Sequence, residues 1–337
     1  MVNCNAMEKP DRPAGFLNRC NTFLDRIMPV LTPGGVVLGF ILGERIAPLK
    51  PLVTYLFAFI TLTGAMGLDI ADFKRVLKNP LPLAAVFVCS HVLLPAFAFL
   101  AASLLFPGQP DIATGYILLT ATPTAVASYI WTSIYYGSGA VSLTVILLDT
   151  LLAPLVTPAV VGIFADSNVN IDTRGMIISL FSMVVIPSVI GVMANHFSKK
   201  KVQRSVVPYC RPLSKIALLA VVAINTSQVA HRISFDSRLL KIIFLNIVIT
   251  VGGYLLGYAA SCGLRVRHDT KVAMTFGTGM RNISAAMVLV ISFFPHDSAV
   301  PVITGIVLQQ MLAAFMGYLL FAGKRKTAEG VSGADTD

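Results

Sequence analysis

The stretch Thr275-Phe-Gly-Thr-Gly-Met-Arg-Asn-Ile-Ser-Ala-Ala-Met287 places a cation and two glycines in a segment that is otherwise apolar enough to lie in a bilayer. An arginine near the middle of a membrane helix is unfavourable by about 2.5 to 3.5 kcal/mol on insertion scales, so it usually faces a cavity or a partner. Gly277 and Gly279 flank Thr278, and such glycines let a helix unwind and present bare backbone groups. The stretch therefore predicts a broken helix in a membrane transporter.

The composition indicates an integral membrane protein. The 337 residues are 55% hydrophobic and 12% charged, and their mean hydropathy of +0.78 is too high for a soluble chain of this length. The net charge of +10 comes from short basic clusters between apolar runs, which is typical of membrane loops and not of a nucleic-acid-binding surface. The five cysteines are scattered without a Cys-x-x-Cys pair, so we expect no disulfide framework, zinc site or other cofactor.

Ten apolar segments of spanning length predict an all-α membrane protein. They cover about residues 27–42, 51–70, 80–106, 112–135, 139–164, 174–197, 208–230, 239–261, 271–294 and 299–322. The first segment is short and contains Pro33-Gly-Gly35; without it nine would remain, and the amino terminus would move outside. Residues 1–26 are predicted to be a cytoplasmic segment, 27–322 the transporter domain and 323–337 a disordered tail.

Basic loops set the expected orientation. They follow the second, sixth, eighth and tenth segments, at Lys74–Lys78, Lys199–Arg204, Arg265–Lys271 and Lys324–Lys326. Because loops rich in lysine and arginine stay in the cytoplasm, both termini are predicted to lie on the cytoplasmic side of the cell (inner) membrane. The loop after the seventh segment runs against this rule, since it carries Arg232 and Arg238.

The ten segments divide into two halves of five, 27–164 and 174–322, and an odd number in each half inverts one half relative to the other. The fourth segment of each half is interrupted. In the first half, Pro123 removes a helical hydrogen bond within Leu119-Thr-Ala-Thr-Pro-Thr-Ala-Val-Ala-Ser128. In the second half, the interrupted segment is the glycine-rich stretch. Matching interruptions predict a carrier in which two broken helices cross near the bilayer midplane.

Several motifs together resemble one known family. They are Met66-Gly-Leu-Asp-Ile-Ala-Asp-Phe73, Pro80, Pro123 with Ala127-Ser128, the run from Val141-Ser142 to Pro154-Leu-Val-Thr-Pro158, and Gly279-Met-Arg-Asn282. Over about residues 30 to 322, the chain is similar to the bile acid:sodium symporter family. This resemblance implies a panel domain and a core domain, with crossing broken helices in the core, and sodium-driven uptake of organic anions by alternating access.

The resemblance also implies where sodium ligands would fall. Oxygen-bearing side chains remain at Ser128, Ser142 and Asn282. The family's asparagine after the first break is replaced by Tyr129, and its threonine one turn after Ser142 is replaced by Ile146, which has no oxygen.

The second break departs further from the family. The glutamate shared by both sodium ions falls at Gly277, and a glutamine falls at Arg281. Hard cations prefer several oxygen ligands with a carboxylate to balance their charge. We therefore predict that the second sodium site is absent and that the Arg281 head group occupies or repels it. An ordinary sodium-coupled organic anion or bile acid symporter stays open as the alternative.

Asp149 is the expected partner of Arg281, because it is the acidic residue deep within a predicted membrane segment. It lies three residues after Ile146, on roughly the same helical face as Ser142. We predict an Asp149–Arg281 ion pair that replaces a bound cation by a tethered one. The alternative is a protonated Asp149 that is hydrogen-bonded to a hydroxyl group, since neutralisation is the less costly response to burial.

Further polar side chains are candidates for the path of substrate or coupling ion. If the ion pair is partial, Arg281 would hold a substrate carboxylate, and Asp149 or His91 would take a proton. A lone histidine in an apolar helix is more often a packing residue than a functional one. His91 is therefore either a packing residue or a proton-binding residue of the transport path. Gln309 and Gln310 are polar enough to line a cavity, although such side chains also bond between helices. The coupling ion is H⁺ or Na⁺.

Two other functional classes remain as alternatives to a carrier. A membrane-embedded enzyme would need a metal or nucleophile constellation, and the sequence has no His-Glu-x-x-His motif. A channel would differ from a carrier by unsaturated flux. The expected partners are a small organic anion and the lipid bilayer, without nucleic acid; no oligomeric state is predicted.

Overall fold

The computed structural model describes residues 12–67, 76, 78, 80–164, 172–228, 230 and 236–332. All regular elements in these ranges are helical. The longer helices are α1 (Arg12–Leu42), α2 (Lys50–Ala65), α8 (Gly139–Phe164), α12 (Val207–Ser227), α13 (Ser237–Gly263) and α16 (Ala299–Ser332). Shorter ones are α4 (Leu81–Val88), α5 (Leu94–Leu105), α6 (Pro110–Ala121), α7 (Ala127–Ile134), α9 (Thr173–Leu180), α10 (Ile186–Phe197), α11 (Lys201–Ser205), α14 (His268–Gly279) and α15 (Ile283–Phe293).

Two wide π-helical turns join shorter helices into continuous rods. The turn η3 (Cys89–Leu93) connects α4 to α5, and η4 (Phe181–Val185) connects α9 to α10. Single turns of 3₁₀ helix complete the chain at η1 (Gly43–Arg45), η2 (Ala47–Leu49) and η6 (His296–Ser298).

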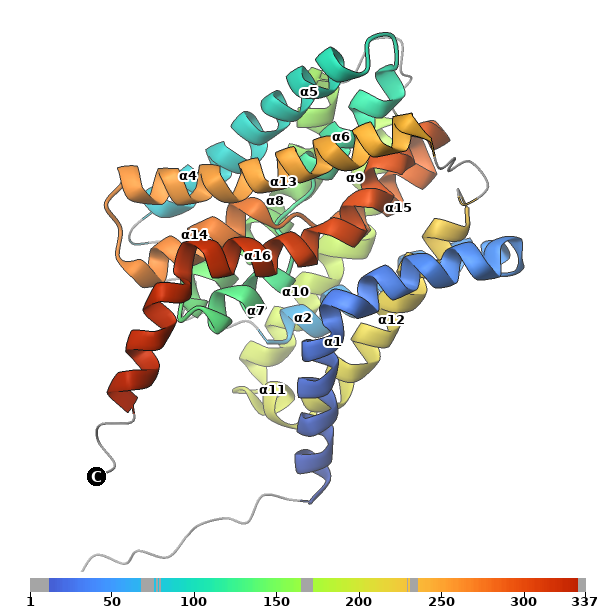
Figure 1. Cartoon of the computed structure of the whole chain (residues 1–337). Coiled ribbons are helices and arrows are strands. Elements are labelled where there is room, and N and C mark those ends of the chain that lie inside the picture. The colour runs from blue at the N-terminus through green and yellow to red at the C-terminus, as the bar shows by residue number, and fades with distance from the viewer. Residues whose placement is uncertain are drawn as a thin grey trace, which may run out of the picture.

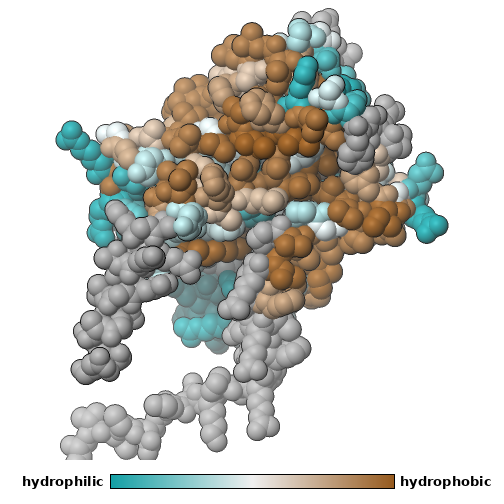
Figure 2. All heavy atoms as spheres, in the orientation of Figure 1, coloured by the Kyte–Doolittle hydropathy of each residue, from teal (hydrophilic) through white to brown (hydrophobic). Residues whose placement is uncertain are grey.

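Seven continuous helical stretches among the described residues are long and apolar enough to cross a membrane. Figure 2 shows hydrophobic residues over most of one face, with hydrophilic side chains gathered toward its ends. The two interrupted segments fall outside that set because each of their halves is too short to span alone. The structure thus confirms a multi-pass, all-helical membrane protein, and the count of ten spans stays a prediction.

The helices pack in two groups (Figure 1). Helix α12 packs along α1 and α2, and α2 also packs against α10. In the other group, α13 packs against α14 and α16, and α6 packs against α5, α8 and α16. The sequence-based division into panel and core corresponds to these two groups.

The two broken helices meet at their interruptions. Helix α6 ends at Ala121 and α7 begins at Ala127, so the break contains Pro123 as predicted. The Ala125 N–H donates to the Met280 carbonyl at 3.0 Å, and the Asn282 N–H donates to the Pro123 carbonyl at 2.7 Å. Each break thereby supplies backbone partners to the other, which satisfies polar groups that lipid would leave unpaired.

The second break lies later than the sequence indicates. Gly277 and Gly279 are still helical, and the interruption falls at residues 280–282. Gly279 is required by packing instead: a Cβ there would lie 2.2 Å from Cδ1 of Tyr254 on α13. The glycine therefore lets α13 approach α14 and holds the end of α14 in place.

Gly279→Ala is expected to lower the free energy of unfolding by about 1–3 kcal/mol, because the added methyl group overpacks the α13–α14 contact. Gly263→Ala is the matched control, since a Cβ at Gly263 meets nothing within 4 Å. Thermal unfolding of both variants in detergent checks this. Equal midpoints for the two variants would contradict the packing role of Gly279.

The first and last helices extend beyond the predicted spans. Helix α1 begins at Arg12, within the segment predicted to precede the first span, and α16 continues to Ser332, within the predicted disordered tail. Residues 324–329, Lys-Arg-Lys-Thr-Ala-Glu, include several good helix formers, so the helix extends beyond the apolar segment. Residues 1–11 and 333–337 lie outside the described residues.

Candidate functional site

Arg281 lies at the crossing of the two broken helices and is almost fully buried, with 2% of its surface exposed. Its backbone forms an isolated antiparallel bridge with Thr124 of the first break. The guanidinium donates to the Thr122 carbonyl and, at 3.4 Å, to the Thr124 hydroxyl. The backbone N–H of Arg281 donates to Oε1 of Gln309 at 2.9 Å. The first break thus holds the guanidinium, and α16 holds the backbone of the same residue.

Asp149 faces this cation from α8. Its Oδ2 atom lies 3.7 Å from Nη1 of Arg281, which is an ion-pair distance. The same oxygen accepts hydrogen bonds from the backbone N–H and the hydroxyl group of Thr124, each at 2.7 Å. Asp149 therefore has both the arginine and the hydroxyl contact that the sequence analysis treated as alternatives.

His91 is the third member of the cluster, and the sequence did not place it beside Asp149. Its Nε2 atom lies 2.6 Å from Oδ1 of Asp149 and 3.4 Å from Nη2 of Arg281. We call His91, Asp149 and Arg281 the buried triad. Residues 91 and 149 are distant in sequence, and only the packing of η3 against α8 brings them together.

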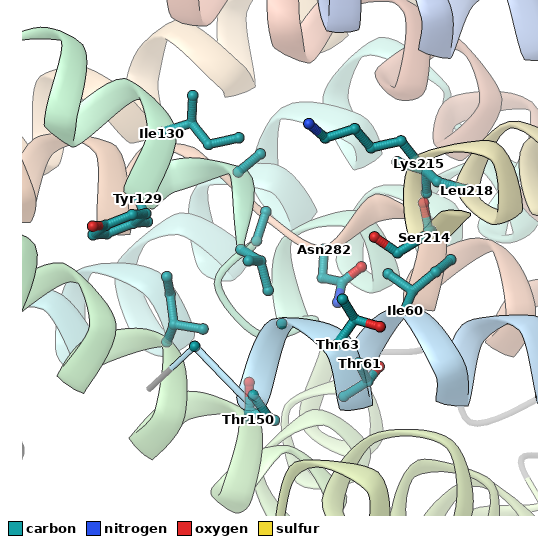
Figure 3. Close-up of a pocket in the computed structure, with 18 of the residues that line it drawn as sticks. Ile60, Thr61, Thr63, Tyr129, Ile130, Thr150, Ser214, Lys215, Leu218 and Asn282 are labelled. Carbon is teal, nitrogen blue, oxygen red and sulfur yellow. The ribbon is translucent and has the colours of Figure 1, made fainter. Parts of the chain in front are cut away.

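A cavity of about 750 Å³ lies between the two helix groups, and Arg281 at the crossing is among its lining residues. Figure 3 shows side chains from α2, α7 and α12 reaching into it, with Asn282 at the crossing. Tyr129, predicted to lie on the substrate path, lines this cavity, and so do Gln309 and Gln310. The lining is mainly apolar, with hydroxyl and amide groups interspersed, as is usual for small-molecule sites.

Lys215 is a cavity residue that the sequence analysis missed. It is buried in α12 and extends into the cavity beside Ser214 (Figure 3). Its ammonium group donates to the carbonyl and side-chain oxygens of Asn21 at 3.0 and 2.7 Å. A lysine inside an apolar span was the available signal, by the same reasoning that singled out Arg281.

Two predicted residues have mainly structural partners. Asn282 accepts a hydrogen bond from the Ala285 N–H at 3.2 Å and so caps α15, while it also lines the cavity. Gln310 accepts a hydrogen bond from Nε1 of Trp131 at 2.9 Å, which ties α16 to α7. Trp131 carried no sequence signal beyond its place in an apolar segment.

The remaining predicted oxygens do not converge on the triad. The hydroxyl groups of Ser128 and Thr278 are buried and have no hydrogen-bond partner among the described residues. Ser142 lies 3.5 Å from the Thr132 hydroxyl, at the limit of a hydrogen bond. At Gly277 the backbone carbonyl accepts from Thr124 at 2.9 Å, in the place where the family resemblance puts a glutamate side chain.

The overall fold has a solved counterpart. The sodium proton antiporter MjNhaP1 from Methanocaldococcus jannaschii superposes with a TM-score of 0.58 at 15% identity, over 92% of this chain and 98% of that one. At this identity the likeness concerns the fold alone.

Sequence comparisons identify the family. The Bacillus subtilis protein YbaS is 37% identical over 294 residues, which cover 87% of this chain and 96% of YbaS. The sodium-dependent transporter YocS of the same organism is 28% identical over 267 residues, covering 79% and 81% of the two chains. Residues 53–234 match the model of the Sodium Bile acid symporter family. The protein is a secondary transporter, not an enzyme, and it belongs to the Sodium Bile acid symporter family.

Proposed function

We propose that the protein carries a small or medium organic anion across the cell (inner) membrane by alternating access. The observation that carries this proposal is the charge of the cavity wall. Its lining includes the cations Arg211, Lys215 and Arg281, and no aspartate or glutamate is among its described lining residues. A concave site lined by one sign of charge with apolar walls attracts ligands of the opposite sign.

In this conformation, Lys215 is the residue proposed to contact the negatively charged group of the substrate. Arg281 lines the cavity, but its guanidinium contacts Asp149 and carbonyl and hydroxyl groups of the first break. Lys215 belongs to α12 in the other helix group, where its ammonium group also contacts Asn21. An anion bound between Lys215 and Asn282 would therefore contact both helix groups whose relative movement transports it.

Lys215→Met is expected to raise the KM for the transported anion by roughly 10- to 100-fold, since a charge-assisted hydrogen bond contributes about 1.5–3 kcal/mol. Lys241→Met is the matched control, because Lys241 is exposed on α13 and does not line the cavity. Uptake measured against anion concentration checks this. An unchanged KM in Lys215→Met would contradict the assignment.

We further propose that the buried triad replaces the second sodium site. Arg281 holds a fixed positive charge at the crossing, and Asp149 balances it at 3.7 Å. A sodium ion at the same place would meet the guanidinium without a free carboxylate, and like charges in a poorly solvated site repel strongly. The competing proposal is sodium symport. YocS is named a sodium-dependent transporter, and the buried oxygens at Ser128 and Ser142 favour this alternative.

The cavity is proposed to face the cytoplasm. Its lining includes Gly67 at the end of α2 and Gln203 of α11, both next to basic loops that the sequence places inside. At the opposite end, Nζ of Lys50 on α2 donates to the Ile291 carbonyl of α15 at 3.3 Å and joins the two helix groups. This arrangement supports both termini being cytoplasmic.

Counterflow in proteoliposomes tests the proposed function. Vesicles loaded with an unlabelled organic anion, from a panel of monocarboxylates and dicarboxylates, are expected to accumulate the labelled anion transiently and with saturation. Linear flux without counterflow would indicate a channel and would contradict the proposal. Absence of any flux for every anion in the panel would also contradict it.

A further inference from the structure

The π-helical turn η3 gives His91 its position. Pro95 has no N–H, so the carbonyl of His91 lacks its helical donor, and the helix widens at this point. The Leu94 N–H donates to the carbonyl of Cys89, five residues earlier. His91 is 3% exposed and points toward α8 and the crossing, and wide turns of this kind often occur at functional sites.

A proton lies between His91 and Asp149. Oxygen Oδ2 of Asp149 already accepts two hydrogen bonds from Thr124, whereas Oδ1 contacts Nε2 of His91 at 2.6 Å. A contact this short between nitrogen and oxygen requires one hydrogen atom, carried by either group. The two side chains therefore share one proton at a buried site, where His91 and Asp149 are 3% and 4% exposed.

A second proton would change the charge of the triad. With neutral His91, the positive Arg281 and the negative Asp149 sum to zero. A further proton has a place at Nδ1 of His91, which is buried and has no hydrogen-bond partner among the described residues. The triad would then carry one positive charge, and an uncompensated buried charge is strongly unfavourable.

Among the described residues, no other titratable group around η3 forms a hydrogen bond or ion pair with the imidazole ring. The turn packs against α4, α5, α6, α8, α13 and α14. Tyr116 of α6 donates to the Ile242 carbonyl at 2.7 Å, and Tyr254 of α13 packs against Phe276. Cys89 lies in the same turn, two residues before His91. Among the described residues, Asp149 and Arg281 are therefore the charged groups that contact His91 and determine where its proton lies.

We propose that His91 and Asp149 bind the proton that drives transport, so that the carrier is a proton–anion symporter. This inference rests on the proposed function and deepens it. An anion in the cavity, which Arg281 of the triad lines, compensates the additional positive charge and so favours binding of the second proton. By thermodynamic reciprocity, the bound proton favours the anion to the same degree.

Sodium-free proteoliposomes with an imposed pH gradient test this symport. If one proton accompanies each monovalent anion, an interior one pH unit more alkaline than the exterior is expected to give about tenfold accumulation of the anion. His91→Gln is expected to lose this accumulation, while exchange of anion for anion is slowed but present. His196→Gln, at an exposed position on α10, is the matched control and keeps both.

The outcomes separate the two proposals. Exchange that is present in the native protein but insensitive to the pH gradient would overturn the symport, and so would gradient-driven accumulation by His91→Gln at the native level. Absence of exchange in the native protein would overturn the proposed function and the symport with it.

Proton uptake by the purified native protein provides a second measurement in case His91→Gln does not fold. Adding a transported anion to protein in weakly buffered detergent solution is expected to raise the pH, because the anion-bound triad takes up a proton. An unchanged pH at saturating anion would overturn the symport.

Discussion

Asp149→Asn and Arg281→Gln are each expected to abolish anion exchange and to lower the free energy of unfolding by about 3–5 kcal/mol, because each leaves the opposite charge buried without its partner. The double variant Asp149→Asn/Arg281→Gln has no uncompensated charge. Its loss in the free energy of unfolding is expected to be about 0.5–3 kcal/mol smaller than the sum of the two single losses. Chemical unfolding in mixed micelles measures all three variants.

The exposed pair Arg238 and Asp297 is the control for this cycle. Their side chains are 44% and 42% exposed and lie 3.2 Å apart. Exposed pairs contribute at most about 1 kcal/mol, so Arg238→Gln and Asp297→Asn are expected to change stability little. Purely additive losses in the Asp149 and Arg281 variants would contradict an ion pair at the crossing.

Gly277→Glu combined with Arg281→Gln is expected to make anion transport depend on sodium. The two substitutions remove the fixed cation and supply a carboxylate at the positions where the family resemblance places its sodium ligands. Space is available, since a Cβ at Gly277 would meet its nearest neighbour, Cγ1 of Val145, at 3.4 Å. The measurement is the ratio of anion uptake in sodium to uptake in choline.

Gly277→Gln with Arg281→Gln is the matched control, because it has the same size and lacks the carboxylate. Sodium should stimulate only the glutamate variant. Equal stimulation of the two variants by sodium would contradict the view that the charges at these two positions select the cation. The absence of stimulation in both variants, when both exchange anions, would contradict it as well.

The crossing of two broken helices was predictable because its determinants are local. Pro123 cannot continue a helical ladder, and a buried arginine needs a cavity or a partner, so each break is visible in its own segment. The position of the second break was less predictable. Gly277 and Gly279 are adjacent to it but helical, and the need for glycine at 279 arises from Tyr254, a residue of another helix.

The composition of the buried triad was only partly predictable. Asp149 is the acidic residue in a deep apolar segment, and charge pairing alone connects it to Arg281. His91 joins them because Pro95 widens its helix and turns the imidazole ring toward α8, which depends on a local departure from ordinary helical geometry. Lys215 was missed although its sequence context, a cation within an apolar span, resembles that of Arg281.

Anion uptake in sodium and in choline, at equal pH on both sides of the membrane and with the same native protein, tests the central claim most directly. If the guanidinium of Arg281 permanently replaces a dissociable cation at the crossing, the initial rate of uptake is the same in the two media. A rate that collapses when choline replaces sodium would contradict the account.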